Sequence, residues 1–334
     1  MKVPYDTLVS VLERVVNENG IEGEDGRLCA SLFADASRDG VYSHGLNRFP
    51  RFINDIKKGT IDVNARATLD SSFGPLERWN GNRGPGNLNA YAAMKRAIEK
   101  AKENTVGIVA LRNTNHWMRA GNYGLMAADN DCIGIMWTNT MPNMTAWGGK
   151  DVRIGNNPIV FAVPHGDEPV IVDCAMSLFS YGKLETLSRA GKETPVDAGY
   201  DSNGNVSRNP GEVASTMQVF PIGYWKGSGL SIVLDLIAAS LAGGDTTRLI
   251  GERGGETEVC QIFIAISLSH FPDRKRIDEE IGRTLEYIKS STPRDEKHPV
   301  HTPGEGMRKI RQESMTSGVT VDDEIWNRVL SMCL

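Results

Sequence analysis

The chain has 334 residues, of which 40% are hydrophobic and 24% are charged, so it is long and apolar enough to form one large domain or two. Its formal net charge of −5, without a run of Lys or Arg, argues against the basic surface that is typical of nucleic-acid-binding proteins. Five scattered cysteines without a Cys-x-x-Cys pair, and a start without an apolar signal segment, predict a reduced, cytoplasmic protein that does not enter a membrane.

Three amphipathic helices are predicted in the first sixty residues. Apolar residues recur there at helical spacing in three runs that each stop near a glycine: 5–16, 28–36 and 49–56. The same pattern returns in the C-terminal tail, over residues 281–288 and 325–330. We therefore expect a helical domain that is built from both chain ends, residues 1–70 and 290–334.

The middle of the chain has the pattern of a sheet with interleaved helices. Short apolar runs of the kind that form buried strands occur five times: 106–111, 133–137, 159–163, 170–173 and 262–266. We expect a mixed α/β domain over residues 71–289, so the fold class is α/β or α+β. The segment from Leu230 to Leu241 is nearly all apolar but too short to span a bilayer, and it is predicted to be a buried helix.

The most suggestive polar stretch runs from Tyr42 to Phe52 and contains a hydroxyl, an imidazole and guanidinium groups among bulky apolar side chains. If His44 and Arg48 lie in one helical turn, their four-residue spacing places them on the same face. An imidazole can transfer a proton near neutral pH, and a guanidinium can hold a carboxylate. The alternative is a helix start in which Ser43 is the cap, His44 is exposed and the arginines are solvated.

A nucleotide site of the usual kinds is not predicted. The sequence contains neither Gly-x-Gly-x-x-Gly nor a Walker-type P-loop. The stretch Trp225-Lys226-Gly227-Ser228-Gly229 opens directly onto the apolar helix, where unpaired N–H groups and the charge of Lys226 can hold a diphosphate. The alternative is a glycine-rich turn that leads into a core helix.

His116 is a second candidate, because it follows the strand predicted to end near Leu111 and loops at strand ends often carry active-site groups. A packed or solvated histidine without a chemical role is the alternative. The spacing of the histidines matches no metal-binding pattern, so no catalytic metal is expected. The segment 201–205 resembles a calcium loop but lacks the distal glutamate, and it is predicted to be a turn.

Taken together, six blocks of sequence resemble the malate/L-lactate dehydrogenase family, which is unrelated to the Rossmann-type lactate dehydrogenases. The blocks lie in order along essentially the whole chain, and the first, second and fifth are specific. They are Tyr-Ser-His-Gly-Leu-Asn-Arg-Phe-Pro-Arg-Phe-Ile (42–53), Val-Ala-Leu-Arg-Asn-Thr-Asn-His-Trp-Met-Arg-Ala-Gly-Asn-Tyr-Gly (109–124), Arg-Ile-Gly-Asn-Asn-Pro (153–158), Val-Asp-Cys-Ala-Met-Ser-Leu-Phe-Ser-Tyr-Gly (172–182), Tyr-Trp-Lys-Gly-Ser-Gly-Leu-Ser-Ile-Val-Leu-Asp (224–235) and Pro-Gly-Glu (303–305).

The resemblance implies a homodimer with an NAD(P) fold of its own, in which the cofactor lies extended across a mixed sheet. NAD is the expected cofactor, with NADH preferred and NADPH as the alternative. The family's cofactor contacts carry over to Ile171, Val172, Asp173, Cys174, Ala175, Met176, Ser177, Trp225, Lys226, Gly304, Glu305 and Gly306.

The expected reaction is hydride transfer to C2 of a 2-keto acid, and the resemblance is closest to the branch that converts 2,3-diketo-L-gulonate to 3-keto-L-gulonate. It implies that His44 protonates the reduced carbonyl. We assign the orientation of His44 to Ser43, carboxylate binding to Arg48, and contacts to substrate hydroxyl or carbonyl groups to His116 and Asn115.

Two departures from the family pattern bear on the substrate. Gly155-Asn156-Asn157-Pro158 stands where the family commonly has Gly-Thr-Asn-Pro, and Met144-Thr145-Ala146 stands where the branch often has Pro-Pro. One alternative is therefore reduction of another 2-keto or cyclic imino acid, of the malate, lactate or pyrroline-2-carboxylate type. Another alternative is a sugar-acid-binding protein that retains the fold without catalysis.

Overall fold

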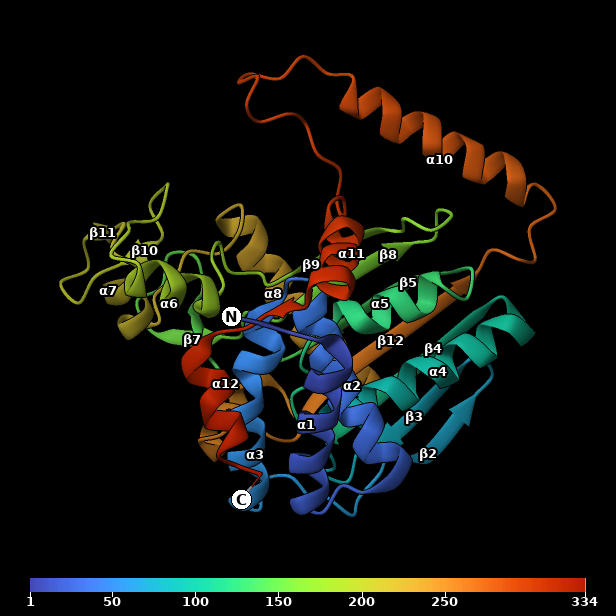
Figure 1. Cartoon of the computed structure of the whole chain (residues 1–334), viewed down its shortest axis with the longest axis horizontal. Helices are drawn as coiled ribbons and strands as arrows, with labels where there is room; N and C mark the ends of the chain where they lie inside the picture. The colour runs from blue at the N-terminus through green and yellow to red at the C-terminus, as the bar shows by residue number, and fades with distance from the viewer. Residues whose placement is uncertain (334) are drawn as a thin grey trace.

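The computed structural model describes residues 1–333 and is organised around a seven-stranded mixed sheet (Figure 1). β3 and β4 run parallel, and the other neighbouring strands of this sheet run antiparallel. In spatial order the strands are β2 (Thr68–Phe73), β3 (Leu76–Asn80), β4 (Val106–Thr114), β12 (Val259–Ser267), β5 (Cys132–Thr138), β8 (Ile159–Val163) and β9 (Val170–Cys174). The α/β class and the mixed sheet are thereby confirmed.

Successive residues of the central strands serve two different cores, because side chains alternate across a strand. Val109 and Phe263 lie in the core that is covered by α4 (Gly86–Asn104) and α5 (Gly121–Ala128). Ala110 and Ile262 face the opposite way, into the core that is covered by α8 (Trp225–Ala242). The sheet is thus buried on both faces, which explains why its strands appear in the sequence as continuous apolar runs.

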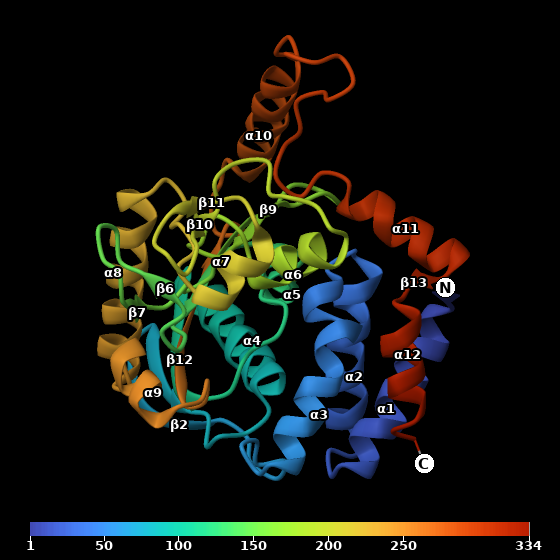
Figure 2. The same cartoon turned by 90° about the vertical axis from the view of Figure 1, so that its left-hand side faces the viewer.

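The helical layer is built from both chain ends and packs beside the sheet (Figure 2). Short strands β1 and β13 pair antiparallel, with Lys2 opposite Thr320, and fasten the two ends together. The elements of this layer are β1 (Lys2–Val3), α1 (Tyr5–Glu18), α2 (Gly23–Arg38), α3 (Phe49–Lys57), α11 (Met307–Ser317), β13 (Val319–Thr320) and α12 (Asp323–Leu330). The predicted domain bounds stay a prediction, although β2 begins at Thr68 and already belongs to the sheet.

The remaining elements lie in the connections between the strands of the main sheet and its neighbours. They are β6 (Met144–Thr145), β7 (Val152–Ile154), α6 (Tyr181–Arg189), β10 (Gly199–Tyr200), β11 (Val206–Ser207), α7 (Pro210–Thr216), α9 (Thr247–Arg253) and α10 (Arg274–Lys289). α10 has no buried residue and projects from the body of the molecule (Figure 1).

The prediction of a buried helix over 230–241 is wrong in one respect. α8 packs one face on the sheet, where Leu234 is 8% exposed, but Leu230, Val233 and Leu236 on the other face are each more than half exposed. α8 also begins earlier than expected, at Trp225. Among the described residues it is the one helix that is long and apolar enough to cross a membrane by length and composition. Its contact with the sheet includes a hydrogen bond from Trp137 Nε1 to the Leu234 carbonyl oxygen.

Candidate active site

The stretch that carries His44 does not form the single helical turn that the spacing predicts. It forms two 3₁₀ turns, η1 (Tyr42–His44) and η2 (Leu46–Arg48), separated by Gly45. A Cβ at Gly45 would lie 2.2 Å from Ser37 Oγ and 2.7 Å from the Ser37 nitrogen, so glycine is required where this turn touches α2. Ser37 Oγ also accepts a hydrogen bond of 2.8 Å from the Leu46 N–H. The turn is therefore held against α2 by backbone contact.

His44 and His116 come together from distant parts of the chain. Their rings stack with a centroid separation of 5.8 Å and an interplanar angle of 18°. Ser43 Oγ lies 3.1 Å from His44 Nδ1, so the serine is placed to fix the orientation of that ring. With Nδ1 engaged by Ser43, Nε2 is the His44 atom suited to exchange a proton with a ligand.

The second histidine has a defined tautomer. The Met118 N–H donates a hydrogen bond of 2.9 Å to His116 Nδ1, so a neutral His116 carries its proton on Nε2. Burial, followed by the charge of Arg48, lowers the pKa of His116 well below its usual value. His116 is thus a neutral hydrogen-bond donor at physiological pH, which suits contact with a carbonyl oxygen.

His44 is also neutral in the free protein. Burial, with smaller effects from Arg48 and Arg119, lowers its pKa to about 4. A ligand that brings negative charge to this site offsets the arginines and favours the protonated imidazole. Proton uptake by His44 is therefore coupled to the binding of an anion.

Arg48 lies at the end of η2, and its Nη2 is 4.0 Å from Glu256 Oε2. Both side chains are largely buried, at 23% and 14% exposure. Glu256 stands in the connection between α9 and β12, more than 200 residues along the chain, and sequence reasoning missed it. A glutamate in a Gly-Gly-Glu-Thr-Glu loop matches no functional motif, so its contact with Arg48 could be found only from the structure.

Asn115 joins the loop that carries His116 to the loop that follows β3. Its Nδ2 donates hydrogen bonds to the carbonyl oxygens of Arg83 at 2.7 Å and Gly84 at 3.0 Å, and the residue is 4% exposed. Gln261 Nε2 in turn donates to the Asn115 carbonyl oxygen. Contact between Asn115 and a substrate stays a prediction.

A buried cluster of charged side chains lies at the C-terminal end of α2, just before the turn that carries His44. Asp39, whose side chain is fully buried, accepts hydrogen bonds from Arg119 at 2.6 Å, Arg38 at 2.9 Å and Arg311 at 2.8 Å. Burial favours the neutral acid, but the hydrogen bonds from the arginines outweigh it and lower the pKa of Asp39. The cluster joins the end of α2 to α11 and to the loop after β4, and it carries Arg119 close to His44.

The three segments predicted to bind the cofactor lie side by side along β9. The Ile171 N–H donates to the Pro303 carbonyl oxygen at 3.3 Å, and a Cβ at Gly304 would lie 2.9 Å from Ile171 Cγ2. At the other end, the Ile222 N–H donates to the Met176 carbonyl oxygen at 2.8 Å, just before α8 begins. The structure therefore places residues 303–304 at one end of segment 171–177 and residue 222, three residues before Trp225, at the other end.

These residues fit a polar cofactor. Ser177 is 5% exposed, and in the described part of the chain its Oγ has no hydrogen-bond partner. Asp173, at the end of β9, accepts a hydrogen bond of 2.8 Å from the Gly121 N–H. Trp225 and Lys226 are exposed at the start of α8, where the positive end of the helix dipole and the charge of Lys226 suit a phosphate. Residues 1–333 contain no cluster of His, Cys, Asp and Glu arranged to hold a metal ion.

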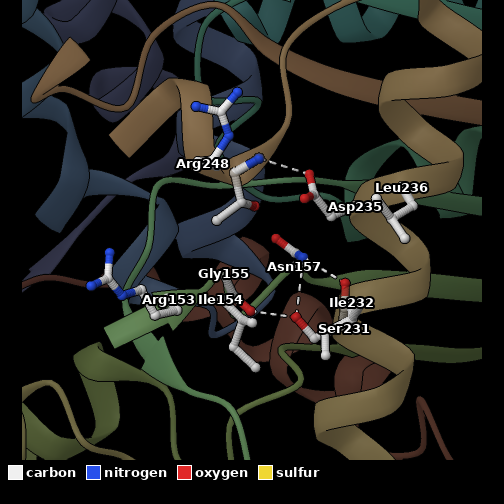
Figure 3. Close-up of a pocket in the computed structure, with 10 residues that line it drawn as sticks. Arg153, Ile154, Gly155, Asn157, Ser231, Ile232, Asp235, Leu236 and Arg248 are labelled. Carbon is white, nitrogen blue, oxygen red and sulfur yellow. Dashed lines mark hydrogen bonds between the residues drawn. The ribbon is translucent and has the colours of Figure 1, made fainter. Parts of the chain in front are cut away.

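A separate cavity of about 180 Å³ lies between β7 and the exposed face of α8 and does not include His44 (Figure 3). Asn157 and Ser231 close its inner wall, where Asn157 Nδ2 donates to Ser231 Oγ at 3.1 Å. Asn157 lies in the block Gly155-Asn156-Asn157-Pro158, which departs from the family pattern at Asn156. Asn156 Oδ1 accepts a hydrogen bond of 3.0 Å from Asn143 Nδ2, so the side chain of the departing residue is bonded within the protein.

The mixed sheet and the likeness to known proteins together define a dehydrogenase of the non-Rossmann kind, which interconverts hydroxy acids and keto acids with a nicotinamide cofactor. The chain belongs to the malate/L-lactate dehydrogenase family, and the sequence model of that family matches residues 3–330. It is 44% identical over 334 residues to a 2,3-diketo-L-gulonate reductase from Mannheimia succiniciproducens, covering 99% of this chain and 100% of the relative.

Solved structures agree with this assignment. Malate dehydrogenase from Pyrococcus horikoshii superposes with a TM-score of 0.90 at 30% identity, over 100% of this chain and 95% of the other. Malate dehydrogenase from Entamoeba histolytica superposes with a TM-score of 0.94 at 26% identity, over 99% and 97%. The resemblance expected from the six sequence blocks is thus confirmed over the full length.

Proposed function

We propose that the chain reduces the C2 carbonyl of 2,3-diketo-L-gulonate to give 3-keto-L-gulonate, with NADH as the preferred hydride donor. The observation that carries the proposal is the stacked pair of His44 and His116 beside Arg48, with Ser43 on the His44 ring. The full-length similarity to reductases that are named for this substrate supports the choice of keto acid.

Each residue of the site has a distinct task in this proposal. The nicotinamide supplies the hydride when it is bound, and the protein supplies orientation, charge and a proton. Arg48 binds the substrate carboxylate, and the Nε2–H of His116 donates a hydrogen bond to the carbonyl oxygen. His44, which takes up a proton when the anionic substrate binds, protonates the same oxygen as negative charge develops on it. Asn115 is proposed to add a contact to a substrate hydroxyl group.

The remaining parts of the proposal concern the cofactor and the assembly. Ile171 to Ser177, Trp225, Lys226 and Gly304 to Gly306 hold the cofactor, with Lys226 at the diphosphate. The exposed apolar face of α8 and the projecting α10 support a homodimer, because an apolar face of this size is normally covered by another protein surface. We place the enzyme in the cytoplasm, consistent with five free thiols among the described residues.

A panel of keto acids tests the proposal as a whole. NADH or NADPH oxidation is followed with 2,3-diketo-L-gulonate, pyruvate, oxaloacetate and a cyclic imino acid such as pyrroline-2-carboxylate. The highest kcat/KM is expected for 2,3-diketo-L-gulonate with NADH. Preference for one of the other acids would reassign the substrate within the family, and no turnover with any of them would favour a binding protein.

Lys226→Ala is expected to weaken NADH binding about 10- to 100-fold, because it removes a charge-assisted contact to phosphate that contributes roughly 1.5–3 kcal/mol. Fluorescence titration with NADH measures the effect. Lys183→Ala, on the nearby helix α6, is a suitable control because that lysine is not placed in the cofactor segments. A dissociation constant that is equal to that of the unmodified protein would remove Lys226 from the cofactor site.

Arg48→Lys is expected to lower kcat/KM for the keto acid at least tenfold, about 1.4 kcal/mol, while leaving NADH affinity unchanged. Lysine keeps the charge but loses the planar fork that binds both carboxylate oxygens, so the keto acid tilts away from His44. An uncharged amide analogue of the substrate separates the two explanations. Equal losses on acid and amide would show that Arg48 is structural, and Arg119 would then be the next candidate for the carboxylate site.

A further inference from the structure

Glu256 is an acidic group that the structure places against the proposed carboxylate site, and nothing in the mechanism uses it. Its carboxylate lies 4.0 Å from Arg48 Nη2, in ion-pair contact. At 14% exposure its side chain is nearly enclosed by protein. An entering keto acid therefore meets an arginine that already has an anionic partner.

The charges around Glu256 come from the segment that carries Arg48. Burial, which is the largest effect, raises the pKa of Glu256, and the charge of Asp55 acts in the same direction. The charges of Arg48 and Arg51 lower this pKa but do not offset the effect of burial. Arg51 is itself 3.9 Å from Asp55, so Arg48 is the principal partner of Glu256. Two carboxylates that share one guanidinium repel each other, so a substrate carboxylate bound at Arg48 competes with Glu256 for the same charge.

The loop that carries Glu256 contains a pair of glycines with open surroundings. Gly254 has φ +76°, and added Cβ atoms at Gly254 and Gly255 would meet nothing within 4 Å. The two ends of the loop are joined by an ion pair, in which Arg253 Nη1 lies 2.9 Å from Glu258 Oε2. Glu256 therefore lies in a short segment that is closed at its ends and unobstructed beside its glycines.

We propose that Glu256 is a specificity-determining residue that selects polyhydroxylated 2-keto acids over short ones. The substrate carboxylate replaces Glu256 at Arg48, and the displaced glutamate accepts hydrogen bonds from hydroxyl groups further along the substrate chain. A short keto acid such as pyruvate has no hydroxyl group to offer, so it leaves a nearly buried carboxylate without a partner. A site built to bond a hydroxyl group strongly rejects the analogue that lacks it.

Three variants test this inference, which rests on the proposed function. Glu256→Gln removes the charge that competes for Arg48 but keeps an oxygen that accepts hydrogen bonds from hydroxyl groups. Glu256→Ala removes both. Glu258→Gln is the matched control, because Glu258 lies in the same loop but pairs with Arg253 and Arg83. Thermal unfolding of each variant confirms that it folds.

The expected result is a change of selectivity rather than a general loss. Both Glu256 variants are expected to raise kcat/KM for pyruvate and to bind oxamate, a short dead-end analogue, about tenfold more tightly in the presence of NADH. Glu256→Ala is expected to lower kcat/KM for 2,3-diketo-L-gulonate at least tenfold, whereas Glu256→Gln keeps most of it. Glu258→Gln is expected to leave both substrates unchanged.

Two results would overturn the inference, and they differ from the result that overturns the proposed function. An unchanged dissociation constant for oxamate in Glu256→Ala would show that Glu256 does not compete for Arg48. Equal factors of loss on pyruvate and on 2,3-diketo-L-gulonate would show that Glu256 only supports the structure. Unmodified protein that reduces pyruvate but not 2,3-diketo-L-gulonate would instead overturn the proposed function itself.

Discussion

His44→Ala is expected to lower kcat for keto-acid reduction by roughly 10²–10⁴, the usual contribution of a positioned general acid. The affinity for NADH is expected to stay the same, because the imidazole stacks on His116 and is not placed among the cofactor segments. Stopped-flow and steady-state assays of NADH oxidation measure the effect. His298→Ala, a change at a histidine side chain that is 82% exposed, serves as the control.

The pH profile of the same variant gives a second readout. Because the pKa of His44 is lowered to about 4, the free enzyme holds less of the protonated imidazole as the pH rises above that value. In the unmodified protein kcat/KM for reduction is therefore expected to fall with rising pH, and this slope is expected to disappear in His44→Ala. A variant that keeps both the turnover and the slope would exclude His44 from proton transfer.

Asp39→Asn is expected to destabilise the protein by about 3 kcal/mol, at the lower end of the range for removal of one partner from a buried ion pair. The change leaves Arg119, at 4% exposure, without its counter-ion, whereas Arg311 is 38% exposed and can be solvated. Urea denaturation measures the loss of unfolding free energy. Asp197→Asn removes the partner of Arg208 in an exposed pair and is expected to cost less than about 1 kcal/mol. Equal effects of the two changes would show that the buried cluster adds no more stability than an exposed ion pair.

Much of the fold could be predicted from local pattern. The strands and the helices α1, α2, α3 and α12 lie where apolar spacing places them, because burial on one face or on both leaves a direct mark in the sequence. α10 is an exception, because the apolar pattern over 281–288 predicts a packed face but the helix has no buried residue. The position of β12 between β4 and β5 could not be predicted in this way, since it depends on pairing between strands more than 120 residues apart. The exposure of α8 was missed for another reason: an apolar helix that is buried on all sides and one that leaves an apolar face exposed can have the same composition.

The residues of the site could likewise be predicted in part, whereas their arrangement could not. Ser43, His44 and Arg48 could be chosen because reactive side chains are crowded into one short stretch, and His116 because it follows a strand. Their arrangement could not be predicted, since Gly45 breaks the helical turn where it meets Ser37. Glu256 and Asp39 were missed because single acidic residues are common in any sequence. Their importance comes from burial against arginines that lie elsewhere in the chain.

The pairing of β1 with β13 constrains the order in which this protein can be completed during synthesis. Residues 2–3 find their strand partners only after residue 320 has left the ribosome, and Trp326 packs in the same core as Leu8 and Phe33. α1 and α2 therefore keep part of their apolar faces uncovered until α12 has been synthesised. Contacts of such long sequence separation slow folding and prolong the exposure of apolar surface. The layer that holds His44 in place thus cannot be complete before residue 326 has been made.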